Sequence, residues 1–192
     1  MSDWTVPERL EGRHVTLRAL RREDRAGLLE AFAGLTATFT TFVPDEAGID
    51  AWFDTLERET AAGRAFPFTV LDAEGKVSGA TRFLRMAPAH RRLEIGGTVY
   101  AARVQRTGLN TEAKLLLLTQ AFEAIGCNVV QLRTDWLNDR SRTAIERLGA
   151  KLDGVLRGHL IMPDGHVRDT VVYSILAGEW PGVRAKLAAM MA

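Results

Sequence analysis

Alternation of apolar and polar residues marks the short strands of this chain, and it is clearest from Val15 to Leu20. Two pairs of apolar segments are joined by polar turns at 72–75 and 163–166, each containing Asp and Gly, which is typical of β-hairpins. The pattern as a whole predicts strands at residues 15–20, 66–71, 76–86, 92–100, 128–134, 151–162 and 167–176.

Apolar residues recur at helical spacing between these strands. The predicted helices cover residues 23–32, 49–62, 110–125 and 138–148, with a short last helix from about residue 180. The passage from 92 to 134 should be a right-handed crossover between two parallel strands, and the central strands should otherwise be antiparallel. We therefore expect one α/β (α+β) domain over residues 1–192, with a mixed, mostly antiparallel sheet of about seven strands flanked by helices.

A polar loop between the strand at 92–100 and the next helix is the first candidate site. The loop contains Gly108, and the apolar run of the helix follows it directly. Backbone N–H groups at such a helix start, together with the helix dipole, form a binding site for phosphate groups. The residues expected to hold a phosphate-containing ligand are Gln105, Arg106, Thr107, Gly108, Leu109, Asn110 and Thr111.

Composition narrows the class of protein. The 192 residues include 25 basic and 24 acidic ones, so the net charge is +1 and nothing drives the chain toward nucleic acid or an anionic membrane. The single cysteine, Cys127, excludes an internal disulfide and a multi-cysteine metal site. The four histidines show no metal-ligand spacing, so we expect no metal. With no secretory signal and no apolar run long enough to span a bilayer, a cytoplasmic protein is expected.

Three motifs in order resemble those of the GCN5-related N-acetyltransferase (GNAT) family, closest to the branch of ribosomal-protein N-terminal acetyltransferases. They are Gln105, Gly108 and Asn110 in the loop, then Asn138, Ser141 and Leu148-Gly149, then Asp169, Tyr173-Ser174 and Glu179-Trp180. The likeness covers roughly residues 10–182. One departure concerns the tyrosine that many members carry seven residues after the helix-opening Asn, since Ile145 stands there.

The resemblance implies acetyl-CoA as the donor and a primary amine as the acceptor. A backbone N–H at Val99 would polarise the thioester carbonyl. Glu94 is the first candidate for the base that deprotonates the amine, and the alternative is a solvated strand residue facing outward between Leu93 and Ile95. Asp135 is a second candidate base, whereas Glu112 is expected to complement the helix dipole.

Two residues at the start of the helix at 138–148 have double interpretations. Asn138 is suited to cap the helix, and the matching Asn of the family often binds the pantetheine arm, so both roles can coexist. Ser141 could protonate the departing thiolate in place of the missing tyrosine, or it could be an ordinary first-turn serine.

The acceptor side is less clearly marked. Phe39, Phe42 and Trp136 are candidates to line an acceptor pocket, while Trp52 fits the core stripe of a helix. A basic cluster is either a solvated surface or a contact for the cofactor's 3′-phosphate or an acidic acceptor; it consists of Arg82, Arg85, His90, Arg91 and Arg92.

The motifs and the missing tyrosine distinguish three candidate functions. The leading hypothesis is an N-acetyltransferase acting on a protein N-terminus or a small-molecule amine. The absent tyrosine keeps open an acyl-CoA-binding sensor with little transferase activity. A dinucleotide-dependent oxidoreductase is disfavoured, because the loop has no Gly-x-Gly-x-x-Gly pattern. An exposed strand of the hairpin at 151–176 could also support a homodimer.

Overall fold

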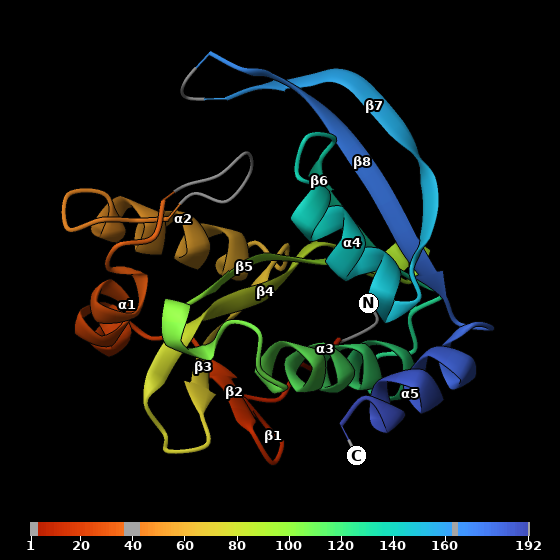
Figure 1. Ribbon diagram of the computed structural model, residues 1–192, viewed down its shortest axis with the longest axis horizontal. Coiled ribbons are helices and arrows are strands. Elements are labelled where there is room, and N and C mark those ends of the chain that lie inside the picture. Colours follow the sequence, from red (N-terminus) through yellow and green to blue (C-terminus); the bar gives the residue numbers. More distant parts are fainter. Residues whose placement is uncertain (1–3, 37–42, 163–164, 192) are drawn as a thin grey trace.

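An eight-stranded sheet forms the centre of the protein (Figure 1). The computed structural model describes residues 4–36, 43–162 and 165–191. The strand order is β1-β2-β3-β4-β5-β6-β8-β7, and among the described strands only β5 and β6 pair in parallel. The strands are β1 (Arg9–Glu11), β2 (Val15–Ala19), β3 (Phe66–Asp72), β4 (Val77–Ala87), β5 (Arg92–Tyr100), β6 (Val129–Asp135), β7 (Lys151–Ile161) and β8 (Val167–Leu176).

Helices cover both faces of this sheet. Figure 1 shows α1 and α2 on one side and α3 with α5 on the other, while the β7–β8 hairpin extends beyond the body of the molecule. The helices are α1 (Arg25–Phe32), α2 (Ile49–Ala61), α3 (Leu109–Thr119), α4 (Asp139–Leu148) and α5 (Trp180–Ala189). A π-helical turn, Gln120–Ala124, continues α3.

The predicted fold class is confirmed, with every predicted strand and helix present to within a few residues at its ends. The sheet has one strand more than expected, because Arg9–Glu11 adds β1 at the edge beside β2. A strand of three residues is too short for alternation to show in the sequence.

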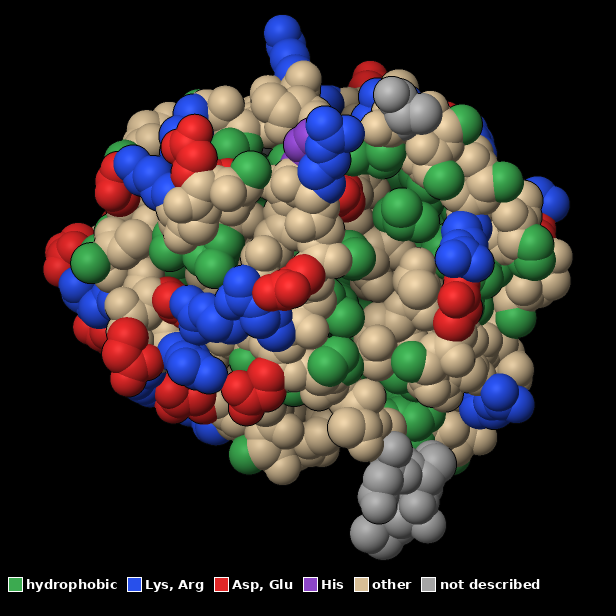
Figure 2. Space-filling model, turned by 90° about the horizontal axis from the view of Figure 1, so that it is seen from below, with side chains coloured by type: hydrophobic (Ala, Val, Ile, Leu, Met, Phe, Trp, Pro, Cys, Tyr) green, Lys and Arg blue, Asp and Glu red, His purple; other side chains and the backbone are tan. Residues whose placement is uncertain are grey.

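Surface charges are mixed rather than separated by sign. Figure 2 shows basic and acidic side chains next to one another on the face seen from below, most densely toward the side of α1. Arg22, for example, is 2.7 Å from Glu57 of α2. This distribution agrees with the near-zero net charge of the sequence.

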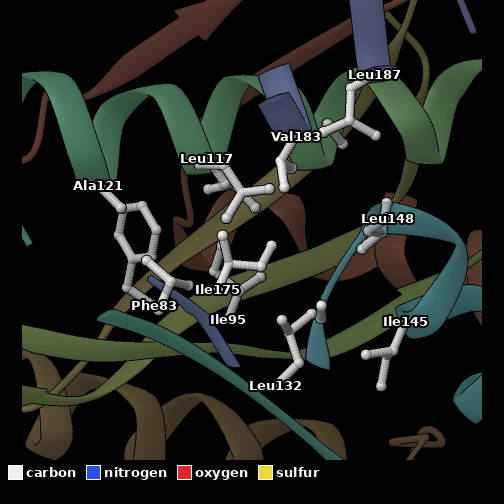
Figure 3. Close-up of a cluster of buried hydrophobic side chains, with 14 of the residues drawn as sticks. Phe83, Ile95, Leu117, Ala121, Leu132, Ile145, Leu148, Ile175, Val183 and Leu187 are labelled. Atoms are coloured by element: carbon white, nitrogen blue, oxygen red, sulfur yellow. The ribbon is translucent and has the colours of Figure 1, made fainter. Parts of the chain in front are cut away.

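The larger hydrophobic core lies between the sheet and the helices α3, α4 and α5 (Figure 3). Four neighbouring strands contribute Phe83, Ile95, Leu132 and Ile175. Against them pack helix residues that include Leu117, Ala121, Ile145, Leu148, Val183 and Leu187. Burial of each large apolar side chain contributes roughly 1.5–3 kcal/mol, so this layer fixes the helices on the sheet. A second, smaller core lies beneath α1 and α2.

The sheet parts between β5 and β6. These two strands pair over only three positions, from Arg92 with Val129 to Glu94 with Gln131. Beyond that point β5 continues along β4 to Tyr100, and β6 continues along β8. The facing edges of the two strands therefore diverge, and their backbone groups no longer bond to each other.

A β-bulge in β5 accompanies this divergence. Ala80 pairs with Val99 and Arg82 with Gly96, so β5 carries an extra residue between these pairs. Gly97, inside the bulge, has φ +56°, a left-handed conformation that glycine adopts without strain. The sequence analysis predicted no bulge, although glycines inside a strand, such as the adjacent pair 96 and 97, are typical of one.

Gly79 is where β4 approaches the bulged strand most closely. Its φ is +149°, and a Cβ atom there would lie against the Val99 carbonyl oxygen, far inside van der Waals contact. We therefore expect Gly79→Ala to lower the free energy of unfolding by about 2–4 kcal/mol, through strain and overpacking together. Denaturant unfolding measures this, with Gly154→Ala as control because a Cβ there meets nothing within 4 Å. Equal stability of the two variants would contradict the close approach.

Candidate active site

A cleft of about 1060 Å³ opens where β5 and β6 part. Its walls come from β4 and β5, the N-terminal turns of α3 and α4, the helix α2 and the β7–β8 hairpin. The cleft thus runs from the C-terminal end of β5 to the region beneath α2. The predicted phosphate-binding loop at residues 105–111, here called the phosphate loop, lies at the β5 end. Such a concave site with convergent polar groups is the usual form of a small-molecule site.

The loop before α3 offers free backbone donors. The first intrahelical bond runs from the Glu112 N–H to the Gly108 carbonyl, at 3.0 Å. The N–H groups of Asn110 and Thr111 therefore have no intrahelical acceptor, as at any helix start. Arg106 has φ +63°, a conformation uncommon outside glycine and frequent at functional sites. This end of the cleft fits an anionic group such as a pyrophosphate.

Gln105 connects the loop to its surroundings rather than pointing a free amide at the cleft. Its Nε2 donates to the Tyr100 carbonyl at 2.9 Å, and its Oε1 accepts from Arg140 Nη2 at 2.8 Å. These bonds tie together the end of β5, the loop and the first turn of α4. Arg140 also lines the cleft and adds a positive charge there, which the sequence interpretation missed.

The predicted cofactor residues divide into two groups. Those that line the cleft are Val99, Gln105, Arg106, Asn110, Asn138 and Ser141. Thr107, Gly108 and Leu109 border a second hollow of about 260 Å³. Thr111 is buried at 5% exposure. The latter four residues could therefore serve a ligand in the cleft only through their backbone.

Glu112 has a structural role that differs from the predicted one. Its buried carboxylate accepts hydrogen bonds from the N–H groups of Arg13, His14 and Val15, at 2.8, 2.6 and 2.9 Å. It therefore holds the β1–β2 turn against α3 and keeps the helix start in place. Its position after the phosphate loop had suggested only a contribution to the helix dipole.

Glu94 lies in the cleft wall and is only 4% exposed, so it is not the solvated strand residue considered as the alternative. Its Oε2 accepts from Arg85 Nη1 at 2.8 Å and lies 3.1 Å from Arg133 Nε. Burial raises the pKa of Glu94, opposed by the charges of Arg85, Arg133 and Arg168. A buried carboxylate with a raised pKa in a cleft is suited to accept a proton.

Asn138 caps α4 as expected, since its Oδ1 accepts from the Ser141 N–H at 3.0 Å. The amide nitrogen of Asn138 is not used by that bond, and the residue lines the cleft together with Ser141. Ile145, at the tyrosine position of the family, is 7% exposed and packs into the core. Its side chain has no proton to donate, so Ser141 supplies the hydroxyl that α4 places in the cleft.

Asp135 is fully buried and does not line the cleft. Its Oδ1 accepts from the Leu137 N–H at 2.9 Å, and its Oδ2 lies 3.1 Å from His166 Nε2. It fixes the turn after β6 instead of facing a substrate.

Among the described residues, the aromatic side chains that line the cleft are Phe32, Trp52 and Tyr100, and the predicted Trp136 is not among them. Trp136 is 43% exposed, lies outside the residues that line the cleft, and has the Arg142 guanidinium 4.3 Å from its ring centroid. Trp52 of α2 packs against the smaller core, as its helical spacing had indicated, and also lines the cleft. Phe39 and Phe42 lie outside the described residues.

The basic cluster also divides, because Arg82 and Arg85 line the cleft whereas His90, Arg91 and Arg92 do not. Arg133 and Arg168 join the first two from β6 and β8, at positions far apart in the sequence. No local pattern could have grouped these four arginines before the strand order was known.

Lys114 is a further residue of the cleft wall that the sequence interpretation missed. It is 6% exposed, and its Nζ donates to Thr98 Oγ1 at 2.9 Å. Thr98 is bonded in turn to Thr81 at 2.8 Å. Burial lowers the pKa of Lys114 to about 8. The signal was its place as a lysine beside the apolar run Leu115–Leu118.

We expect Lys114→Met to raise the free energy of unfolding at pH 7 by about 1–3 kcal/mol, because burial of the cation destabilises the folded state. This cost is fully present below pH 8 and disappears as the pH rises toward 10.5, where the lysine is neutral in both states. Denaturant unfolding at pH 7 and pH 10 should show the gain shrinking. The exposed Lys186→Met is the control, and a pH-independent gain would contradict the account.

Comparisons with known proteins agree with this geometry. The family model "Acetyltransferase (GNAT) domain" matches residues 14–151. YdaF of Bacillus subtilis (strain 168), named as a candidate ribosomal N-acetyltransferase, is 27% identical over 88% of this chain and 94% of its own. A solved structure from T. thermophilus, described as a candidate acetyltransferase, is 36% identical with a TM-score of 0.86, covering 98% of this chain and all of its own.

A third similar structure is Mycobacterium smegmatis RimJ in complex with CoA-disulfide. It is 23% identical with a TM-score of 0.76, covers 92% of this chain and 88% of its own, and at that identity shows the shared fold. Within the described residues, no helix is long and apolar enough to cross a membrane. No group of three His, Cys, Asp or Glu among them could hold a metal ion.

The family match spans well over half of the chain, and the relatives resemble it over nearly its full length. The predicted resemblance to the GNAT family is confirmed, and the similarity to YdaF supports its predicted likeness to the ribosomal-protein acetyltransferase branch. The chain belongs to the GNAT family and is an N-acetyltransferase.

Proposed function

We propose that the protein transfers an acetyl group from acetyl-CoA to a primary amine by direct attack in a ternary complex. The observation that carries this proposal is the buried Glu94 carboxylate in the wall of the same cleft that the phosphate loop enters. Donor and acceptor could then meet beside one proton-accepting group.

The residues around the diverging strands fit acetyl-CoA. The free N–H groups at the start of α3, with the charges of Arg106, Arg140 and Lys114, would hold its phosphates. The Asn138 amide would bind its amide-containing arm, and the Val99 N–H would face its carbonyl oxygen. When bound, acetyl-CoA supplies an acyl group activated as a thioester.

Glu94 would remove a proton from the acceptor, directly or through water. An alkyl amine is mostly protonated at neutral pH and must lose a proton before it can act as a nucleophile. The raised pKa of Glu94 makes its carboxylate a better proton acceptor than an exposed one. Ser141 Oγ would hold the proton for the departing sulfur, in place of the tyrosine that other members carry.

The acceptor is a protein N-terminus or a small-molecule amine. The name of YdaF supports a ribosomal protein as acceptor. The contribution of Phe39 and Phe42 to the acceptor site stays a prediction, as does the cytoplasmic location.

A homodimer remains part of the proposal. β7 lies at the sheet edge, and its hairpin exposes apolar side chains, among them Ile161 at 80% and Leu152 at 56%. A long apolar edge strand invites pairing with another chain. Sedimentation velocity tests this, and a monomer at micromolar concentration would remove it.

A second candidate function for this member of the family is an acyl-CoA-binding sensor or partner protein with little transferase activity, favoured by Ile145 in place of the tyrosine acid. Both functions require cofactor binding, so they differ in turnover and in its dependence on Glu94. A variant at Glu94 therefore separates them.

Glu94→Gln should lower turnover, measured as release of free thiol, by about 10²–10⁴-fold, because the amide cannot accept the proton. The affinity for acetyl-CoA should stay nearly unchanged. In the unaltered protein kcat/KM should fall as the pH drops through the raised pKa of Glu94, and the variant should lack this dependence. Glu23→Gln, at an exposed position, is the control. Unchanged turnover in Glu94→Gln would remove Glu94 from the mechanism.

A further inference from the structure

We propose that the acceptor is an acidic amine, with a carboxylate a few bonds from the reacting nitrogen, and that Arg82, Arg85, Arg133 and Arg168 bind that carboxylate. This inference rests on the proposed function and specifies its substrate class. The shared chemistry is that of a free amino acid or of a peptide N-terminus followed by an acidic residue.

The four arginines converge on Glu94 from three strands. Arg85 of β4 and Arg133 of β6 lie 2.8 and 3.1 Å from its Oε2. Arg168 of β8 is close enough for the charges of Glu94, Arg85 and Arg133 to act on it. Arg82 of β4 lies against Gly97, and it is close enough for the charges of Arg85 and Glu94 to act on it. All four line the cleft.

Positive charge exceeds negative charge in this group. The carboxylates acting on the arginines from within the sheet are Glu94 and Asp135, and Asp135 also lies against His166. Glu59 of α2 adds a third negative charge, which acts on Arg82 more strongly than Glu94 does. Three carboxylates, two of them buried, thus face four guanidinium groups.

Part of this guanidinium surface also has no hydrogen-bond acceptor. Within the described part of the chain, the Nε atoms of Arg82 and Arg168 are buried without a hydrogen-bond partner, whereas Arg133 Nε is paired with the Glu94 carboxylate. Arg168 is itself only 8% exposed. A buried charge without a hydrogen-bonded counterion costs free energy, and an anionic ligand nearby would offset part of that cost through its charge. The ligand would contact the accessible guanidinium atoms, since the side chains of Arg85 and Arg133 are 46% and 17% exposed.

The phosphates of acetyl-CoA do not account for these arginines. The phosphate loop follows Tyr100, whereas Glu94 lies near the start of β5, where that strand still pairs with β6. Six residues of β5, including its bulge, separate the two positions by up to about 20 Å. Arg106, Arg140 and Lys114 supply positive charge at the loop end. The arginines around Glu94 therefore form a separate anion site.

This site would both select and orient the acceptor. Guanidinium groups bind carboxylates through paired, directional hydrogen bonds, which would fix the amine beside Glu94. The same charges would repel a polyamine, since like charges placed together disfavour the wrong partner. The arginines are positioning residues here, and Glu94 remains the proton acceptor.

The test compares matched acceptors on the full-length protein. One arm uses the amidated tetrapeptides Ala-Glu-Ala-Ala and Ala-Gln-Ala-Ala, and the other uses free glutamate against its diamide. We expect the acidic member of at least one pair to have a kcat/KM higher by about tenfold or more, mainly through KM. The arm that shows the preference identifies the source of the carboxylate. Spermidine should be the poorest acceptor.

Arg168→Gln should reduce the preference in that arm to near unity, whereas the exposed Arg157→Gln of β7 should keep it. Arg85→Gln, at a half-exposed side chain, is the second variant if Arg168→Gln does not fold. Equal use of the acidic and amide acceptors in both arms, or a preference for spermidine, would overturn the proposal.

Calorimetric titration of the same acceptors into protein saturated with CoA measures recognition without turnover. Selective binding of an acidic acceptor with no acetyl transfer would contradict the proposed function while supporting the anion site. Acetyl transfer to amines with no preference for acidic acceptors would support the proposed function and contradict the anion site.

Discussion

The parting of β5 and β6 is the constraint on which the rest of the site depends. The two strands bond over three positions and then diverge, because β5 stays with β4 and β6 stays with β8. The bulge at Gly97 and the close approach at Gly79 hold β5 in its course. Since α3 starts where β5 ends and α4 starts where β6 ends, the same divergence brings both helix N-termini to one cleft.

Charge is distributed along this cleft in two separate groups. At the loop end, Arg106, Arg140 and the buried Lys114 accompany free helix N–H groups. At the paired end, Glu94 lies among arginines that partly neutralise it while burial raises its pKa. The first group suits a ligand rich in phosphate, and the second suits proton transfer beside a negatively charged acceptor.

Short-range patterns in the sequence predicted the features that depend on neighbouring residues, namely the helices, the strands and the loop before α3. Alternation and helical spacing gave the elements, and a polar loop with Gly108 before an apolar helix indicated the anion site. Contacts that depend on strand order, such as those of Arg133 and Arg168 with Glu94, could not be predicted from short-range patterns. Trp52 packs against the smaller core as expected and also lines the cleft, because spacing identifies a helix face without saying whether that face meets core, cleft or both. Trp136, expected at the cleft, lies outside it and is 43% exposed.

The central claim is that the cleft between the diverging strands binds acetyl-CoA. Calorimetric titration of the purified protein with acetyl-CoA, with NADH and ATP as controls, tests it most directly. The account predicts selective binding at micromolar affinity or better, where ~1 μM corresponds to about 8 kcal/mol. Absence of binding, or equal binding of NADH and ATP, would contradict it.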